Sequence, residues 1–244
     1  MSHLTLRNPH SVLEALRERP EDVFEVRLER GASAAWQEVR AAAVEAGVTV
    51  REVLHKANRT RGRGDAKAQR RSNSEASVRP RGDVEARQLF GSSDSETGLW
   101  LALDQIQDPH NVGAIFRTAA FFGVKGIVLT RDRSAPITET VYDVASGGVE
   151  HVPFSRQTNL ARMVDVAKEA GLWVLGTSEH AEVDVNEVKL DRRWLLVLGN
   201  EERGLRRLTL KHCDMVCRLT PRGSIESLNV SVAAGVLMGA LSRD

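Results

Sequence analysis

The sequence WLLVLGNEERGLRRLTLKHCDMVCRLTPRGSIESLNVSVAAGVLMGAL, residues 194–241, decides the fold of this chain. Its first run, Trp194–Leu198, is continuously apolar, which is typical of a parallel strand that is covered on both faces. A second short apolar run, Met215–Leu219, predicts another strand. The last run, Leu228–Leu241, is apolar on nearly every side and predicts a helix that is buried rather than lying on the surface.

Polar residues follow both predicted strands. Asn200 and Glu201 come directly after the first strand, and Ser227 and Asn229 lie at the start of the closing helix, beyond the second strand. Ligands of parallel α/β sheets bind beyond the carboxyl ends of the strands. We therefore expect the active site at these two strand ends, which we take to be adjacent. Taken singly, the same residues also suit helix capping, and Ser227 before an apolar helix is a natural N-cap.

Upstream of this stretch, from Leu99 onward, predicted strands and helices alternate. The expected strands are Leu99–Leu103, Lys125–Thr130, Val149–Pro153 and Leu172–Gly176, and the expected helices are Asn111–Phe122, Thr138–Ser146 and Leu160–Ala170. Such alternation predicts an α/β fold with a mostly parallel sheet and helices on both faces.

The N-terminal part of the chain has a smaller α/β pattern. It predicts helices over His10–Arg17 and Ala34–Ala46 and strands over Val23–Leu28 and Val48–Leu54. From Asn58 to about Glu96 the periodicity is lost, apart from a short candidate strand at Ala76–Val78. The predicted domains are therefore residues 1–80 with a basic arm, a linker over 81–97, and a larger domain over 98–244.

The net charge of +1 conceals a basic segment. Lys56–Arg81 holds nine Lys or Arg and two Asp or Glu, a balance of +7, so the rest of the chain carries −6. This segregation favours a polyanion as partner. A solvated linker that happens to be basic is the alternative.

Composition and motif searches exclude several classes of protein. Cys213 and Cys217 are the only cysteines, and they suit buried thiols in a reducing compartment better than a disulfide or a metal site. We find no GxGxxG after a strand, no Walker A sequence, no export signal and no span long enough for a bilayer. We therefore expect a cytoplasmic protein without a resident metal.

The stretch DPHNVGAIFRTAAFFG, residues 108–123, predicts an amphipathic helix with Asn111 as its N-cap. Arg117 lies off the apolar face and shares its side with Gly113, four residues earlier. An arginine above a bare glycine near a helix start is accessible to a phosphate. The alternative is an ordinary surface arginine.

Together these stretches resemble the SpoU/TrmH family of RNA ribose 2′-O-methyltransferases, within the SPOUT superfamily. Three family motifs occur in family order: DPHNVGAIFRTAAFFGV (108–124), LVLGNEERGL (196–205) and LTPRGSIESLNVSVA (219–233). The likeness covers roughly Leu99–Leu241. Residues 1–80 resemble the small L30e-like domain that binds substrate in this family.

The resemblance implies a C-terminal trefoil knot whose loops hold S-adenosylmethionine through backbone groups. The implied cofactor-binding residues are Thr177, Leu198, Gly199, Leu219 and Leu228. The implied catalytic residues are Asn111, Arg117, Glu201, Ser227 and Asn229. Arg117 would contact a phosphate and assist removal of the hydroxyl proton, while the others hold the ribose, Arg117 and the loops in place.

The resemblance also implies an RNA partner and a homodimer with its active site at the subunit interface. The expected substrate is a guanosine ribose of 23S ribosomal RNA. The alternatives are transfer RNA, or a non-catalytic role in RNA binding or ribosome assembly. Two departures from the family pattern stand out: Arg222 where members commonly have Met, and no His-Gln-Gly sequence in Asp65–Val78.

Overall fold

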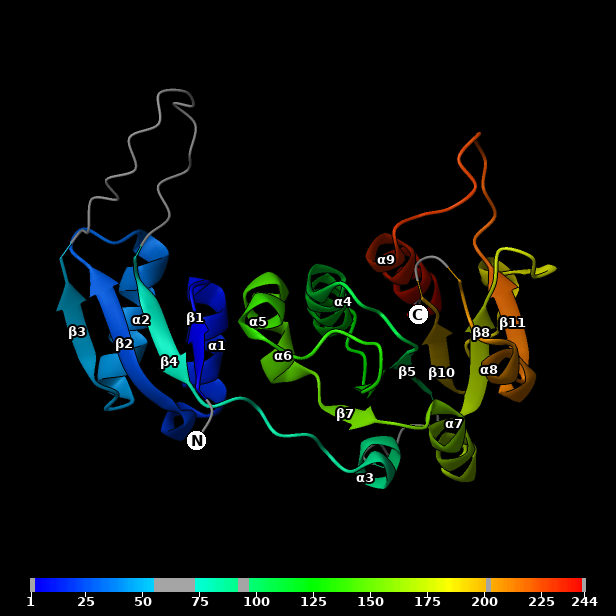
Figure 1. The fold of residues 1–244 in the computed structure, drawn as a ribbon, viewed down its shortest axis with the longest axis horizontal. Helices are drawn as coiled ribbons and strands as arrows, with labels where there is room; N and C mark the ends of the chain where they lie inside the picture. The colour runs from blue at the N-terminus through cyan, green and yellow to red at the C-terminus, as the bar shows by residue number, and fades with distance from the viewer. Residues whose placement is uncertain (1–2, 55–72, 92–96, 201–202, 243–244) are drawn as a thin grey trace. The chain divides into compact units, whose positions relative to one another are not determined.

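The computed structural model describes residues 3–54, 73–91, 97–200 and 203–242. The chain divides into two compact units, Met1–Arg81 and Gly82–Asp244, and Figure 1 labels most of their elements. Glu201 and most of the basic segment Lys56–Arg81 lie outside the described residues. Within the described ranges, no helix is long and apolar enough to cross a membrane.

The first unit contains a sheet with the strand order β1-β4-β2-β3. Its strands are β1 (Leu4–Leu6), β2 (Val23–Glu29), β3 (Val50–Val53) and β4 (Glu75–Val78), and its helices are α1 (Pro9–Glu18), the 3-10 turn η1 (Pro20–Asp22) and α2 (Ala34–Glu45). Strands β2 and β3 are parallel and connected through α2, while β4 pairs antiparallel with both β1 and β2. The predicted helices and strands are confirmed, and β1 was missed because three residues are too few to show alternation.

The second unit is built on a sheet with the strand order β7-β6-β5-β10-β8-β11-β9, in which every pair is parallel. The strands are β5 (Gly98–Leu103), β6 (Gly126–Thr130), β7 (Phe154–Gln157), β8 (Trp173–Thr177), β9 (Val183–Asp184), β10 (Arg193–Leu198) and β11 (Met215–Arg218). This confirms the predicted parallel α/β sheet. The expectation that the strands ending at Leu198 and Leu219 are adjacent was wrong, because β8 lies between β10 and β11.

Helices cover both faces of this sheet, as Figure 1 shows. One group comprises α3 (Ala86–Gly91), α7 (Leu160–Glu169) and α8 (Arg207–His212), and the other comprises α4 (Pro109–Phe121), α5 (Glu139–Ala145), α6 (Gly148–His151) and α9 (Val230–Leu241); the 3-10 turn η2 spans Val185–Glu187. Trp100 and Ala102 of β5 belong to the core cluster that contains α3 and α7. Helix α4 packs against α5, α6 and α9.

Two segments differ from the sequence prediction. The expected linker over 81–97 contains α3, whose Leu89 and Phe90 are buried and whose Leu89 carbonyl accepts a hydrogen bond from the Trp100 indole N–H at 3.0 Å. A helix of six residues is too short to show a helical period. The strand expected at Val149–Pro153 is instead α6 followed by β7, because Gly147, at φ 96°, turns the chain into the helix.

The closing helix α9 is buried on one face only within this chain. Gly235 and Gly239 face α4: a Cβ added there would lie 3.6 Å from Thr118 and 3.3 Å from Phe122. These glycines therefore serve packing within the unit. Val232 and Val236 remain 51% and 48% exposed, so the expectation of a fully buried helix was wrong for the single chain.

Gly113 packs α4 against α5 and offers a direct test of this arrangement. A Cβ at Gly113 would lie 2.7 Å from the Val144 Cβ and 2.8 Å from the Val141 carbonyl oxygen. We expect Gly113→Ala to lower the free energy of unfolding by about 1–3 kcal/mol through overpacking. Urea unfolding followed by tryptophan fluorescence measures this change.

Gly82→Ala is the matched control, because a Cβ there meets nothing within 4 Å. We expect that variant to stay within about 0.5 kcal/mol of the unchanged chain. Equal stability of the two variants would contradict the close α4–α5 packing.

Candidate functional site

A cavity of about 640 Å³ lies at the carboxyl ends of β8, β10 and β11. Its walls come from the loops that follow these strands and from the first turns of α9. All of the predicted cofactor-binding residues line it: Thr177, Leu198, Gly199, Leu219 and Leu228. The predicted catalytic residue Ser227 lines it as well. The structure thus brings residues from three distant loops into one enclosure of the size typical of small-molecule sites.

Hydrogen bonds to backbone carbonyl oxygens and one close backbone approach fix the loops around this cavity. The Thr177 hydroxyl donates to the Val197 carbonyl oxygen at 3.0 Å, and the Ser178 N–H donates to the Cys217 carbonyl oxygen at 3.0 Å. Gly199 lies so close to Gly204 that an added Cβ would come within 2.3 Å of the Gly204 carbonyl carbon. Any side chain at position 199 would therefore force the loop open.

Two of the predicted catalytic residues, Asn111 and Asn229, form a hydrogen-bonded pair. Asn229 caps α9, since its Oδ1 accepts from the N–H groups of Ser231 and Val232, and its Nδ2 donates to Asn111 Oδ1 at 3.1 Å. Asn111 is only 8% exposed. The predicted caps were wrong: Asp108, rather than Asn111, caps α4 through the His110 N–H, and Asn229 rather than Ser227 caps α9.

Arg117 stands on α4, six residues beyond Asn111, and its side chain is exposed. It makes no hydrogen bond or ion pair with the residues that the structure describes, and it does not line the cavity. Gly113 does not leave an open surface for a phosphate below it, because α5 fills that space. Glu201, which was predicted to belong to the same set, lies outside the described residues.

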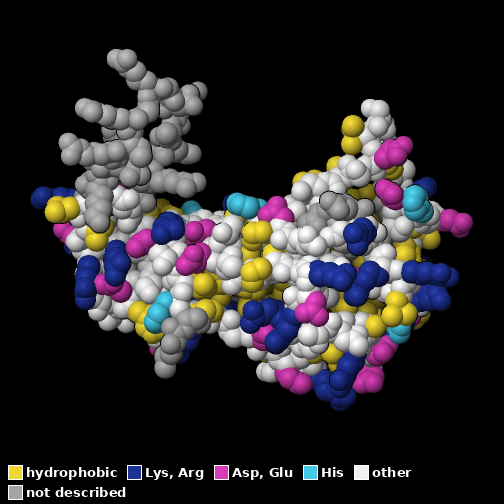
Figure 2. Space-filling view, in the orientation of Figure 1, with side chains coloured by type: hydrophobic (Ala, Val, Ile, Leu, Met, Phe, Trp, Pro, Cys, Tyr) yellow, Lys and Arg dark blue, Asp and Glu magenta, His cyan; other side chains and the backbone are white. Residues whose placement is uncertain are grey.

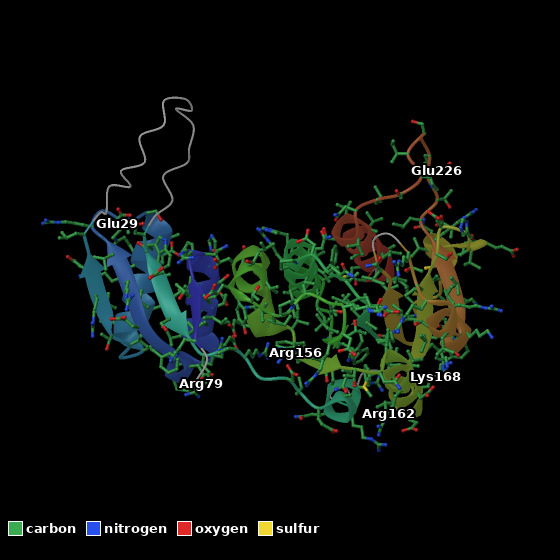
Figure 3. All side chains as sticks on the ribbon, in the orientation of Figure 1. Glu29, Arg79, Arg156, Arg162, Lys168 and Glu226 are labelled. Carbon is green, nitrogen blue, oxygen red and sulfur yellow. The ribbon has the colours of Figure 1, made fainter. Side chains whose placement is uncertain are left out.

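Apart from Arg222, which stood out as a departure from the family pattern, the sequence prediction did not include the charged side chains that line the cavity. Arg203, Arg218, Arg222 and His180 line it, together with Glu179 and Glu226. The Nε atom of Arg218 is buried and makes no hydrogen bond to the described residues. Figure 3 labels Glu226 on the loop that projects between β11 and α9, and Figure 2 shows basic and acidic side chains mixed over the face of this unit that it displays. A signal was present in the sequence, since Arg218 lies at the end of a predicted strand and the others follow predicted strands.

The two cysteines are free thiols, as predicted. Burial raises the pKa of Cys213 to about 11 and that of Cys217 to about 12. Both thiols are therefore protonated at neutral pH, and neither is suited to act as a nucleophile. Cys217 contributes a small apolar side chain to the cavity wall.

Asp184 holds the loop that follows β11 in place through a hydrogen bond from Thr220. Its carboxylate accepts hydrogen bonds from the Thr220 hydroxyl and the Asn186 N–H, and these lower the pKa of Asp184 from 3.8 to about 2. A depressed pKa stabilises the fold above the unfolded value of 3.8, and that stabilisation is lost as the pH falls toward about 2. We expect Thr220→Val to raise the pKa of Asp184 toward 3.8, as measured by carboxyl ¹³C NMR titration. An unchanged pKa would rule out this contact.

Comparisons with known proteins extend these observations. The profile of a family described as the SpoU rRNA Methylase family matches residues 98–239, more than half of the chain. The 23S rRNA (guanosine-2′-O-)-methyltransferase RlmB of Coxiella burnetii is 44% identical over 145 residues, which cover 59% of this chain and 58% of that protein. The enzyme of the same name from Nitrosomonas europaea is 47% identical over 144 residues, covering 59% and 55%. These matches span less than two thirds of each relative.

Solved structures share the fold over nearly the whole chain. The SpoU methyltransferase AviRb from Streptomyces viridochromogenes aligns with a TM-score of 0.79 at 19% identity, over 98% of this chain and 88% of that one. A second structure of AviRb, in complex with the cofactor AdoMet, aligns with a TM-score of 0.76 at 21% identity, over 98% and 89%. At these identities the likeness establishes the fold.

Proposed function

This chain belongs to the SpoU rRNA methylase family, and we propose that it transfers a methyl group from S-adenosylmethionine to a ribose 2′-hydroxyl of RNA. The proposed substrate is a guanosine of 23S ribosomal RNA, because the relatives that are 44% and 47% identical carry that activity in their names. Such a substrate implies that the enzyme works in the cytoplasm.

The observation that carries this proposal is the convergence of five predicted cofactor contacts on one cavity. Leu198, Leu205 and Leu219 offer an apolar surface suited to a purine ring, and the exposed ends of the loops offer backbone N–H and C=O groups. The close approach at Gly199 sets the shape of the wall without a glycine-rich phosphate loop. The residues present therefore fit S-adenosylmethionine.

Bound S-adenosylmethionine would supply an electrophilic methyl group on a sulfonium. An O–CH₃ bond would form as the S–CH₃ bond breaks, the cofactor would leave as the neutral thioether, and the hydroxyl proton would pass to solvent water. The protein must orient the hydroxyl and hold the neighbouring phosphate. The guanidinium of Arg117 stays protonated and donates in a fork that matches phosphate, so we assign it to phosphate positioning. The Asn111–Asn229 pair and Ser227 would hold the ribose beside the cavity.

A second copy of the chain would complete this site. In the single chain, Arg117 does not line the cavity, whereas a methyl transfer that Arg117 assists requires the two to face the same ribose. Helix α4, which carries Arg117, and helix α9 both expose apolar side chains that a second copy could bury. These are Phe121 on α4, which is 83% exposed, and Val232 and Val236 on α9. We therefore propose a homodimer that packs through α9 and the end of α4.

We also propose that the C-terminal segment is threaded as a trefoil knot and that the first unit is an L30e-like domain that binds RNA. The knot is supported by the chain path: after β10 the chain crosses to β11 on the far side of β8, and α9 then returns to pack against α4. The RNA-binding role is supported by the parallel β2-α2-β3 unit and by the basic composition of Lys56–Arg81.

Methyl incorporation tests the proposed activity. Incubation with labelled S-adenosylmethionine should label the ribose of a guanosine in unmodified 23S ribosomal RNA and leave transfer RNA unlabelled. We expect Arg117→Ala to lower turnover by about 100-fold or more while the dissociation constant for S-adenosylmethionine stays nearly unchanged. Arg162→Ala is the matched control, because Arg162 is also an exposed helical arginine, on α7 (Figure 3).

Labelled transfer RNA would identify the alternative substrate. Absence of labelling in any RNA would support a non-catalytic RNA-binding protein. Equal losses of cofactor affinity and turnover in Arg117→Ala would contradict the assigned role of Arg117.

The dimer has its own test. Val236→Arg places a charge on the exposed face of α9, where it should leave the fold of the single chain intact but prevent burial against a second copy. We expect light scattering to report a monomer, with activity lost in parallel. Val44→Arg, on the 66% exposed Val44 of α2, should stay dimeric and active. A dimeric, active Val236→Arg would place the interface elsewhere.

A further inference from the structure

Two residues directly after β5, Asp104 and Gln105, hold the two ends of the loop that forms one wall of the cavity. We propose that they are positioning residues for S-adenosylmethionine, which they do not touch, because they fix residues 199–200 and 203–206 of the cavity wall before the cofactor binds. This inference rests on the proposed function. Neither residue belonged to the set that the sequence suggested, and neither lines the cavity.

Asp104 holds the far end of the loop. Its side chain is 1% exposed. The Arg206 Nε donates a hydrogen bond to Asp104 Oδ2 at 3.0 Å, and Arg206 Nη2 forms an ion pair with Oδ1 at 2.9 Å. The hydroxyl of Thr209 donates to Oδ2 at 3.1 Å. A buried carboxylate that loses its partner is strongly unfavourable, so this pair fixes where Arg206 and the start of α8 lie.

Gln105 holds the near end of the loop through its backbone. It is one of few non-glycine residues of the described chain with a positive φ, 61°, a conformation that persists only where surrounding contacts enforce it. Its N–H donates to the Thr130 hydroxyl at 2.8 Å. Its carbonyl oxygen accepts a hydrogen bond from the Asn200 side-chain amide at 3.0 Å. The turned backbone thus aims this carbonyl at Asn200.

The loop between these two anchors is folded back on itself. The Gly204 N–H donates to the Asn200 carbonyl oxygen at 2.9 Å, and the Arg203 N–H donates to Asn200 Oδ1 at 3.3 Å. Gly199, Asn200, Arg203, Gly204 and Leu205 all line the cavity. Since the described residues on either side of 201–202 are held by these contacts, that part of the wall is preorganised, and preorganisation lowers the cost of ordering a loop on binding.

Asp104→Asn tests the proposal, because it removes the charge and keeps the size of the side chain. Calorimetric titration should give a dissociation constant for S-adenosylmethionine raised by about tenfold or more. The KM for S-adenosylmethionine should rise in the same proportion, while the KM for RNA changes less. A purely structural role would lower the amount of folded enzyme without raising the KM for S-adenosylmethionine relative to the KM for RNA. All values are therefore measured under conditions in which circular dichroism reports a folded protein.

The matched control is Asp83→Asn. Asp83 also pairs with two arginines of the same unit, Arg156 at 2.8 Å and Arg131 at 3.4 Å, but away from the cavity. We expect it to leave the affinity for S-adenosylmethionine unchanged. The milder variants Arg206→Lys and Thr209→Val keep the test decisive if Asp104→Asn does not fold, and each should weaken cofactor binding by itself.

The outcomes separate this inference from the proposed function. If the unchanged chain does not bind S-adenosylmethionine, the proposed function fails. If the unchanged chain binds it and the folded variants at Asp104, Arg206 and Thr209 bind it equally well, the positioning role is overturned and the proposed function stands. Weaker binding in these variants together with normal binding in Asp83→Asn supports the inference.

Discussion

The parallel pairing of β10 with β5 on one side and β8 on the other is the constraint on which the second unit depends. Five of the six residues of β10 are buried, so the strand can lie only in the middle of a sheet with helices on both faces. Parallel strands end at the same edge. The loops after β8, β10 and β11 must therefore meet there, although the ends of these strands lie between 20 and 41 residues apart in the sequence.

That meeting of loops explains how a cofactor site can exist without a glycine-rich fingerprint. The cavity is shaped by hydrogen bonds between backbone groups of its loops, by one tight approach at Gly199, and by the side chains of Thr177 and Asn200, which donate to backbone carbonyl oxygens. The Asn111–Asn229 hydrogen bond links two helices, α4 and α9, whose motifs are 118 residues apart. The same short motifs thus contain residues that line the cavity and residues that hold its loops in place.

Much of this fold follows from the sequence, because long apolar runs and helical periods report burial directly. The parallel sheet, most of its strands and the convergence of Thr177, Leu198, Gly199, Leu219 and Leu228 were predicted. The errors have two causes. Helix α3 is too short to show a helical period, and the caps of α4 and α9 depend on turns that several nearby residues could make. The Asp104–Arg206 pair was missed because its members are 102 residues apart.

The proposed function depends on S-adenosylmethionine binding in the cavity at the ends of β8, β10 and β11. A titration of the ¹⁵N-labelled chain with S-adenosylmethionine, followed by amide NMR, tests this directly. We expect chemical shift changes concentrated at Thr177, at Leu198–Asn200 and around Leu219, with little change in the first unit. No changes, or changes confined to residues distant from these loops, would contradict it.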